Sequence, residues 1–168
     1  FGAYSHIAAL EVDPDAEITP CKTFDECFLK ASLESDSKII IPESNRITGN
    51  IGIEYLIFKY RLNIYAEHFL KIEHNLLGQP GSSISDIKYV FSHAQALSQC
   101  SNFIKKNNLI EHIRADTAGS AETISQNKIK SEAAIASSLS AKTYKLKILA
   151  PNIENENSNT TRFLVMGK

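Results

Sequence analysis

Cysteine, excess charge of one sign and long apolar runs are all scarce in this 168-residue chain. It has three cysteines, Cys21, Cys27 and Cys100, and this odd number argues against a disulfide framework and a zinc knuckle. The 18 Lys+Arg and 19 Asp+Glu give a net charge of −1, which argues against nucleic-acid and anionic-membrane partners. No apolar run approaches the roughly 18 residues of a spanning helix. We therefore expect reduced thiols in a cytoplasmic protein.

Several familiar catalytic motifs are also missing. The five histidines show no metal-ligand spacing with Cys or Asp, so we expect no metal site. There is neither a Gly-rich phosphate loop nor a Gly-x-Ser-x-Gly elbow. No secretory leader is visible, and the chain opens at Phe1-Gly2 without a Met. We expect the sequence to be part of a longer gene product that needs no cofactor.

The pattern along the chain is an alternation of short strands and helices. Helices are expected at 23–35, 50–61, 95–106, 117–127 and from 137 toward 144. Strands are expected at 38–42, 62–76, 87–91, 110–115, 133–137, 147–150 and 161–166. Such alternation is typical of α/β folds with parallel sheets. The composition, 43% hydrophobic and 22% charged, allows one large domain or two small lobes.

A cluster of turn-forming residues divides the chain near residue 78. It reads Gly78-Gln79-Pro80-Gly81-Ser82-Ser83. We expect residues 1–76 and 150–168 to form the first lobe and residues 77–149 the second. Two α/β lobes with a ligand cleft between them would follow, and such clefts commonly bind small molecules.

Two junctions between a strand and a helix carry polar residues. Ser92 follows the strand at 87–91, and Asp116, Thr117 and Ala118 follow the strand at 110–115. Helix N-termini bind carboxylates through their unpaired N–H groups. Alternatively, Ser92, Asp116 and Thr117 are simply helix N-caps. With both junctions in one lobe, we favour a dicarboxylate site.

The last strand begins with a hydroxyl and a cation, Thr161 and Arg162, followed by Phe163. A guanidinium next to a proton-bearing hydroxyl suits a small substrate rich in carboxylates. The alternatives are that Arg162 is a solvated charge or an ion-pair partner, and that Thr161 is only a β-forming residue.

Taken together, these segments resemble the catalytic domain of prephenate dehydratases, in order and over essentially the whole chain. The matching segments are Gly2 to Ala9, Ile41-Pro42 to Gly49, His74-Asn75-Leu76-Leu77, Ser92 to Cys100, Thr117-Ala118, Ala133 to Ser137, Tyr144-x-Leu146 and Thr161-Arg162-Phe163. The resemblance implies two lobes similar to type II periplasmic binding proteins. It also implies decarboxylating dehydration of prephenate to phenylpyruvate, in phenylalanine synthesis, without metal or cofactor.

The resemblance assigns roles to individual residues. Thr161 would act on the leaving hydroxyl, Arg162 would bind a carboxylate, and Phe163 would form the pocket wall. Thr117, Ala118 and Ser92 would hold the pyruvyl side, and Asn45 and Ser5 are further expected substrate ligands. Members of the family are commonly dimers or tetramers, so we expect a homodimer or a homotetramer.

Two departures from the family pattern leave alternatives open. Ser44-Asn45-Arg46 replaces Glu-Asn-Ser, and Asp116 replaces a small Ser. Arg46 could clamp a second carboxylate or block the site. The alternatives are an arogenate dehydratase and a catalytically silent ligand-binding homologue. A plain solute-binding protein would need an export signal. No regulatory ACT domain is expected in these residues.

Overall fold

The computed structural model describes residues 1–168 and consists of two compact units. Unit 1 comprises Phe1–Ala3 and Glu73–Asn157, and unit 2 comprises Tyr4–Ile72 and Ser158–Lys168. The expected lobes differ from these units at residues 1–3 and at two longer segments, residues 73–76 and 150–157. Backbone hydrogen bonds explain why both segments belong to unit 1: Ile153 N–H donates to His74 O at 2.9 Å, and Asn155 N–H donates to Gln99 O at 2.7 Å.

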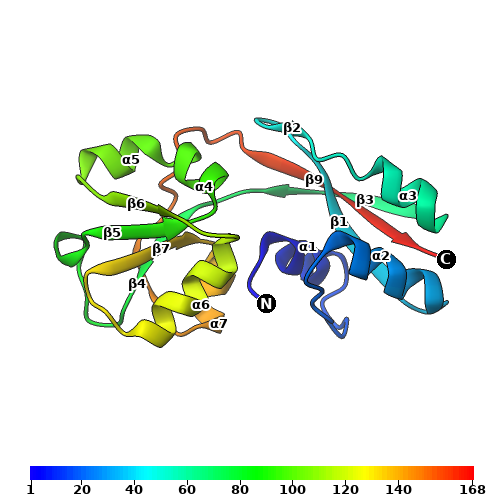
Figure 1. Ribbon diagram of the computed structural model, residues 1–168, viewed down its shortest axis with the longest axis horizontal. Helices are drawn as coiled ribbons and strands as arrows, with labels where there is room; N and C mark the ends of the chain where they lie inside the picture. The colour runs from blue at the N-terminus through cyan, green and yellow to red at the C-terminus, as the bar shows by residue number, and fades with distance from the viewer. The chain divides into compact units, whose positions relative to one another are not determined.

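Unit 2 is a four-stranded sheet with three helices (Figure 1). Its elements are α1 (Tyr4–Val12), α2 (Phe24–Leu33), β1 (Lys38–Asn45), β2 (Gly49–Asn50), α3 (Glu54–Tyr60), β3 (Asn63–Lys71) and β9 (Thr160–Gly167). The strand order is β2-β1-β9-β3, and every pair is antiparallel. The expectation of parallel sheets is therefore wrong for this unit, because β9 returns from the far end of the chain and runs opposite to both neighbours.

The two faces of this sheet pack against different helices. Ile39, Ile41, Leu164 and Met166 form one core with residues of α2 and α3. Their neighbours on the opposite face, Ile40 and Phe163, pack with Leu70, Ile72 and Ala8 of α1. Strand residues alternate between faces, so adjacent residues of β9 have different surroundings.

Unit 1 is a five-stranded sheet covered on both faces by helices (Figure 1). Its elements are β4 (Asn75–Gly78), a 3-10 helix η1 (Ile84–Asp86), β5 (Tyr89–Ser92), α4 (Ala94–Gln99), α5 (Ser101–Lys106), β6 (Ile110–Ile113), α6 (Thr117–Asn127), β7 (Glu132–Ala136), α7 (Ser138–Thr143) and β8 (Lys147–Ala150). The order is β6-β5-β7-β4-β8. Strand β5 is parallel to β6 and β7, whereas β4 is antiparallel to β7 and β8. The chain is thus mixed α/β with two sheets.

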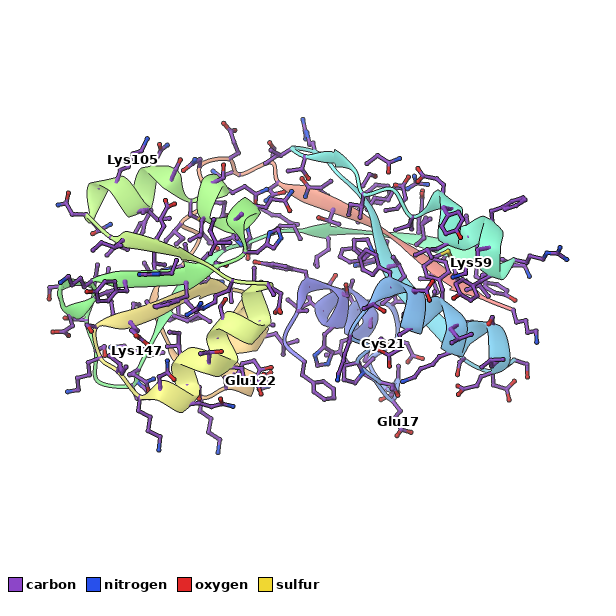
Figure 2. The ribbon with its side chains drawn as sticks, in the orientation of Figure 1. Glu17, Cys21, Lys59, Lys105, Glu122 and Lys147 are labelled. Carbon is purple, nitrogen blue, oxygen red and sulfur yellow. The ribbon has the colours of Figure 1, made fainter.

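Both faces of the unit 1 sheet are buried. Residues of α4 and α5, among them Leu97 and Ile104, pack with Val90 and Ile135 on one face. Residues of α6 and α7 pack with Leu77 and Phe91 on the other. Lys105, Glu122 and Lys147 project from the outside of the unit (Figure 2), so its surface carries both signs of charge. No helix has the length and hydropathy of a membrane span.

Candidate active site

A group of three polar side chains lies where β9 begins in unit 2. Asn45 Nδ2 donates to Thr161 Oγ1 and to Asn159 Oδ1, each at 2.8 Å. Asn45 and Thr161 are cross-strand partners of β1 and β9, which explains why they meet. Thr161 is 7% exposed and Asn159 only 1%. The structure thus brings together two predicted site residues, Asn45 and Thr161.

The orientation of the Asn45 amide follows from the backbone around it. Its Oδ1 accepts from the N–H groups of Ile47 at 2.9 Å and Thr48 at 3.2 Å. A backbone N–H can only donate, so the carbonyl oxygen must face this turn and the NH₂ group must face Thr161 and Asn159. Both amide protons are therefore used within the protein.

Arg162 lies on the other face of the sheet and is engaged by two carboxylates. Its Nε donates to Glu67 Oε2 at 2.8 Å, and its Nη1 to Glu43 Oε2 at 3.2 Å. The hydrogen bond to Glu67 is the main reason why the pKa of Arg162 lies above its usual value. Within unit 2, Arg162 is thus an ion-pair partner of Glu67 and Glu43, which was the alternative interpretation of this residue.

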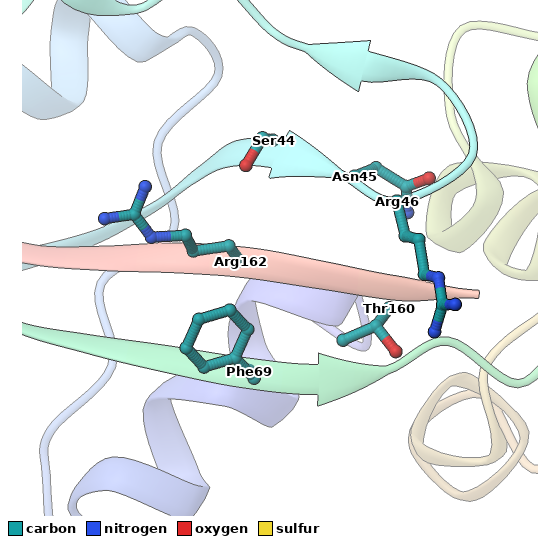
Figure 3. Close-up of a pocket in the computed structure, with 6 residues that line it drawn as sticks. All are labelled: Ser44, Asn45, Arg46, Phe69, Thr160 and Arg162. Atoms are coloured by element: carbon teal, nitrogen blue, oxygen red, sulfur yellow. The ribbon is translucent and has the colours of Figure 1, made fainter. Parts of the chain in front are cut away.

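Around Arg162 the open face of the sheet forms a surface pocket of about 390 Å³. It is lined by Ser44, Asn45, Arg46, Phe69, Thr160 and Arg162. Figure 3 shows Arg162, Thr160 and Phe69 on the near face, with α1 behind the sheet. Arg46 is exposed, reaches toward Thr160, and has no ion-pair partner within 4.0 Å. The pocket thus offers one cation without an ion-pair partner, Arg46, and the exposed ring of Phe69.

Phe163 and Ser5, the two other predicted substrate ligands of unit 2, do not line this pocket. Phe163 is 1% exposed and lies in the core under α1, so its ring supports the strand and does not line the pocket. The reason is alternation: Phe163 shares the face of Thr161, which α1 covers at this position. Ser5 is half-buried at the start of α1, the helix that covers that face.

Ser92 lies at the end of β5 in unit 1 and is fully buried. Its hydroxyl donates to Ile135 O at 2.7 Å. The N-cap of α4 is instead His93, whose Nδ1 accepts from Gln95 N–H at 3.2 Å. The proposed N-cap reading is therefore wrong for Ser92, because its side chain turns into the sheet.

Thr117 and Ala118 open α6, and Asp116 caps that helix. Asp116 Oδ1 accepts from Gly119 N–H at 2.5 Å. Thr117 is half-buried and Ala118 is 5% exposed. The N-cap reading is thus confirmed for Asp116, and one of the N–H groups expected to bind a carboxylate ligand is already occupied by a carboxylate of the chain.

Asn159, Glu43 and Glu67 are functional candidates that the sequence analysis missed. Asn159 stands two residues before Thr161, which is the spacing of side chains on one face of a strand. That spacing was a usable signal for Asn159. Glu67 gave no such signal, because its approach to Arg162 depends on the pairing of β3 with β9. No group of three or more His, Cys, Asp or Glu side chains is placed to hold a metal ion.

Comparison with known proteins identifies the family. The family model described as prephenate dehydratase matches residues 1–168. Arogenate dehydratase/prephenate dehydratase 1, chloroplastic, of Arabidopsis thaliana is 43% identical over 99% of this chain and 43% of its own length. Arogenate dehydratase 2 of Petunia hybrida is 38% identical, with the same two shares. The chain therefore spans less than half the length of these relatives.

A solved structure has the same fold over the whole chain. The structure titled "GqqA- a novel type of quorum quenching acylases" aligns with a TM-score of 0.92 and 33% identity, over 99% of this chain and 61% of that chain. Its similarity extends through both sheets. Since the family model covers every residue, this chain belongs to the prephenate dehydratase family.

Proposed function

We propose that this chain is the catalytic part of an enzyme that converts prephenate to phenylpyruvate, with loss of water and carbon dioxide. The observation that carries the proposal is the Thr161 hydroxyl, held at 2.8 Å by Asn45 within a match to the family that spans the whole chain. Phenylalanine biosynthesis is the process in which this activity would serve.

The chemistry needs one proton and a firmly held substrate. Cleavage of the bond to the ring carboxylate releases carbon dioxide and leaves an electron pair in the ring. That pair expels the ring hydroxyl, which leaves as water after it gains a proton, and the ring becomes aromatic. A positioned side chain that donates to the leaving oxygen lowers the barrier. We assign this role to Thr161, as a hydrogen-bond donor or as a relay for a proton.

The contacts of the other proposed site residues limit what each of them can bind. Arg162 would bind a substrate carboxylate only by loosening its contact with Glu67 or Glu43. Thr117, Ala118 and Ser92 stay proposed ligands of the pyruvyl side, with Ser92 limited to its remaining lone pairs. Ser5 stays a proposed substrate ligand. Phe163 is proposed only as the support of β9.

Arogenate is the second candidate substrate, because the Arabidopsis and Petunia relatives are named arogenate dehydratases. Arogenate carries an ammonium where prephenate has a keto group. The deciding quantity is the ratio of kcat/KM for the two compounds. A higher value for arogenate would change the preferred substrate and leave the assigned mechanism in place.

The test of the proposed function is an assay of phenylpyruvate formation from purified prephenate, with the full-length protein and no added metal. Turnover by this protein would support the dehydratase. A folded protein that binds prephenate without turnover would instead be the catalytically silent homologue, and a variant of Arg46 would then be the next to examine.

We also propose a homodimer or homotetramer, to be measured by light scattering coupled to size-exclusion chromatography. A cytoplasmic location is proposed from the three free cysteines, which fit a reducing compartment. The name of the Arabidopsis relative places that protein in the chloroplast. Fractionation of cells that express the full-length protein would decide between the two locations.

A further inference from the structure

The donors and acceptors of Asn45 are completely used inside unit 2. Its two amide protons go to Thr161 and Asn159, and its carbonyl oxygen accepts two backbone N–H groups. An Asn side chain offers two protons and two lone pairs. Nothing is left over for a substrate, although the resemblance to the family led us to expect Asn45 as a substrate ligand.

The same contacts determine whether Thr161 donates or accepts in its hydrogen bond with Asn45. The Asn45 NH₂ group can only donate, so Thr161 Oγ1 must be the acceptor in that bond. The hydroxyl proton of Thr161 therefore points elsewhere. Within unit 2 the Thr161 hydroxyl donates no hydrogen bond, although the residue is only 7% exposed. A nearly buried hydroxyl thus keeps one unused proton.

We propose that Asn45 and Asn159 are positioning residues that force Thr161 to act as a hydrogen-bond donor toward the substrate. The turn at Ile47 and Thr48 orients the Asn45 amide, Asn159 takes its second proton, and the first proton occupies Thr161 Oγ1. The inference rests on the proposed function, because it assumes that Thr161 faces the leaving hydroxyl.

Burial and a backbone hydrogen bond fix the position of Asn159 beside Asn45. It is 1% exposed, and its backbone oxygen accepts from Ile72 N–H at 2.8 Å, which ties the start of β9 to the end of β3. Its Oδ1 faces the Asn45 amide because only an acceptor suits an NH₂ group. With Asn159 in place, rotation of the Asn45 side chain would break hydrogen bonds on both of its sides.

The deciding variant is Asn45→Asp, which has the same shape but removes both amide protons, the one given to Thr161 and the one given to Asn159. An ionised carboxylate only accepts, so it would take the Thr161 proton and leave none for the substrate. We expect kcat to fall about 10²-fold near pH 8 with KM changed little. Activity should recover as the pH falls and the introduced acid becomes protonated, because it can then donate to Thr161.

A merely structural role for Asn45 would lower activity without that recovery at low pH. Asn107→Asp is the matched control, since the Asn107 amide also donates to an oxygen of the protein, Phe103 O at 2.9 Å, but lies in unit 1 at the end of α5. We expect this control to keep the kcat and the pH profile of the unaltered protein. Thermal unfolding of each variant would verify that it is folded.

Asn159→Ala provides a second test that does not introduce a charge. We expect a smaller loss of kcat, about 10-fold, and no further loss when it is combined with Thr161→Ala. An equal loss in both backgrounds would overturn the proposal, as would an Asn45→Asp protein with unaltered kcat across the pH range. Absence of dehydratase activity in the unaltered protein would refute the proposed function itself, and the inference with it.

Discussion

Thr161 and Arg162 are adjacent in the chain but lie on opposite faces of the unit 2 sheet. Thr161 contacts Asn45 on the face that α1 covers, whereas Arg162 is held by Glu67 and Glu43 on the other face. Alternation along a strand makes this separation unavoidable. The hydroxyl and the guanidinium therefore cannot act as one side-by-side pair, and their contributions should be separable by mutation.

Thr161→Ala should lower kcat about 10²-fold or more, because it removes the hydroxyl proton assigned to the leaving group. Thr161→Ser keeps that hydroxyl and should retain much of the rate. The exposed Thr143, at the end of α7, provides Thr143→Ala as the control. Steady-state phenylpyruvate formation is the measurement, and equal rates in all the proteins would remove Thr161 from the mechanism.

Glu67→Gln should lower the KM for prephenate by a few fold if Arg162 binds a substrate carboxylate, because the guanidinium loses its stronger competing partner. The exposed ion pair itself contributes little to stability, so the variant should remain folded. Arg162→Lys should raise KM even though the charge is kept. An unchanged KM in both variants would limit Arg162 to its contacts with Glu43 and Glu67.

Phe163→Ala should destabilise unit 2 by about 3–5 kcal/mol, because the ring is buried against Leu70, Ile72 and Ala8. Phe163→Leu refills much of the volume and should cost less. The free energy of unfolding from urea denaturation checks both values. If Phe163→Ala had normal stability and a raised KM, Phe163 would be part of the substrate pocket and not of the core.

The buried side chain of His74 should make the stability of unit 1 depend on pH. Burial lowers the pKa of His74 below its ordinary value of 6.5, while its Nε2 contacts Gln99 Oε1 at 2.7 Å. Because the unfolded chain binds the proton more tightly, stability should be full above about pH 6.5 and fall as the pH drops toward the lower folded pKa. Midpoints of thermal unfolding between pH 8 and pH 5 measure this effect. His74→Gln should reduce the slope, and an unaltered slope would assign it to other groups.

The three cysteines should differ in their reactivity toward alkylating reagents. Burial is the main cause that raises the pKa of Cys100 to about 12, and burial followed by the neighbouring Cys21 raises the pKa of Cys27 to about 12. Both are therefore protonated thiols at pH 8. Cys21, on the loop before α2 (Figure 2), should be modified first in a timed mass-spectrometric experiment. Rapid labelling of Cys100 would indicate that unit 1 opens.

Local patterns predicted many elements correctly. The expected bounds of the helix at 117–127 and the strand at 147–150 are those of α6 and β8. Thr23 caps α2 through its Oγ1, which accepts from Glu26 N–H at 3.1 Å, and the capping-box spacing of Thr23 and Glu26 in the sequence predicts this cap. Ala96, Leu97, Cys100 and Ile104 have the spacing of one helical face, and all four are buried. These features depend on neighbours within one or two turns, which periodicity describes well.

Features set by distant partners were predicted less well. The expected single strand over residues 62–76 is two strands, β3 and β4, in different sheets. Ile64 alternates in step with Leu62, Leu70 and Ile72, which are buried, but is itself 54% exposed. A bulge between Ile64 and Ala66 breaks the alternation there. Pro42 was expected to end its strand, but β1 continues to Asn45. Proline is tolerated because β2 pairs only with residues 44 and 45, which leaves that edge open at Pro42.

The candidate site was predicted in its residue types but not in its connections. Thr161 and Asn45 were named, whereas the amide orientation and the part played by Asn159 depend on a turn and on strand register. The expected pairing of Thr161 with Arg162 is not found, because adjacent residues of a strand point to opposite faces of the sheet.

The position of β9 between β1 and β3 has a consequence for how the chain acquires its structure. Unit 2 lacks its central strand until residues 160–167 have left the ribosome, whereas every residue of unit 1 except its first three lies in the continuous stretch before them. Unit 1 should therefore fold first during synthesis, while β1 and β3 still lack the strand that lies between them. Contacts so distant in sequence also make the closure of this sheet the slow step of refolding.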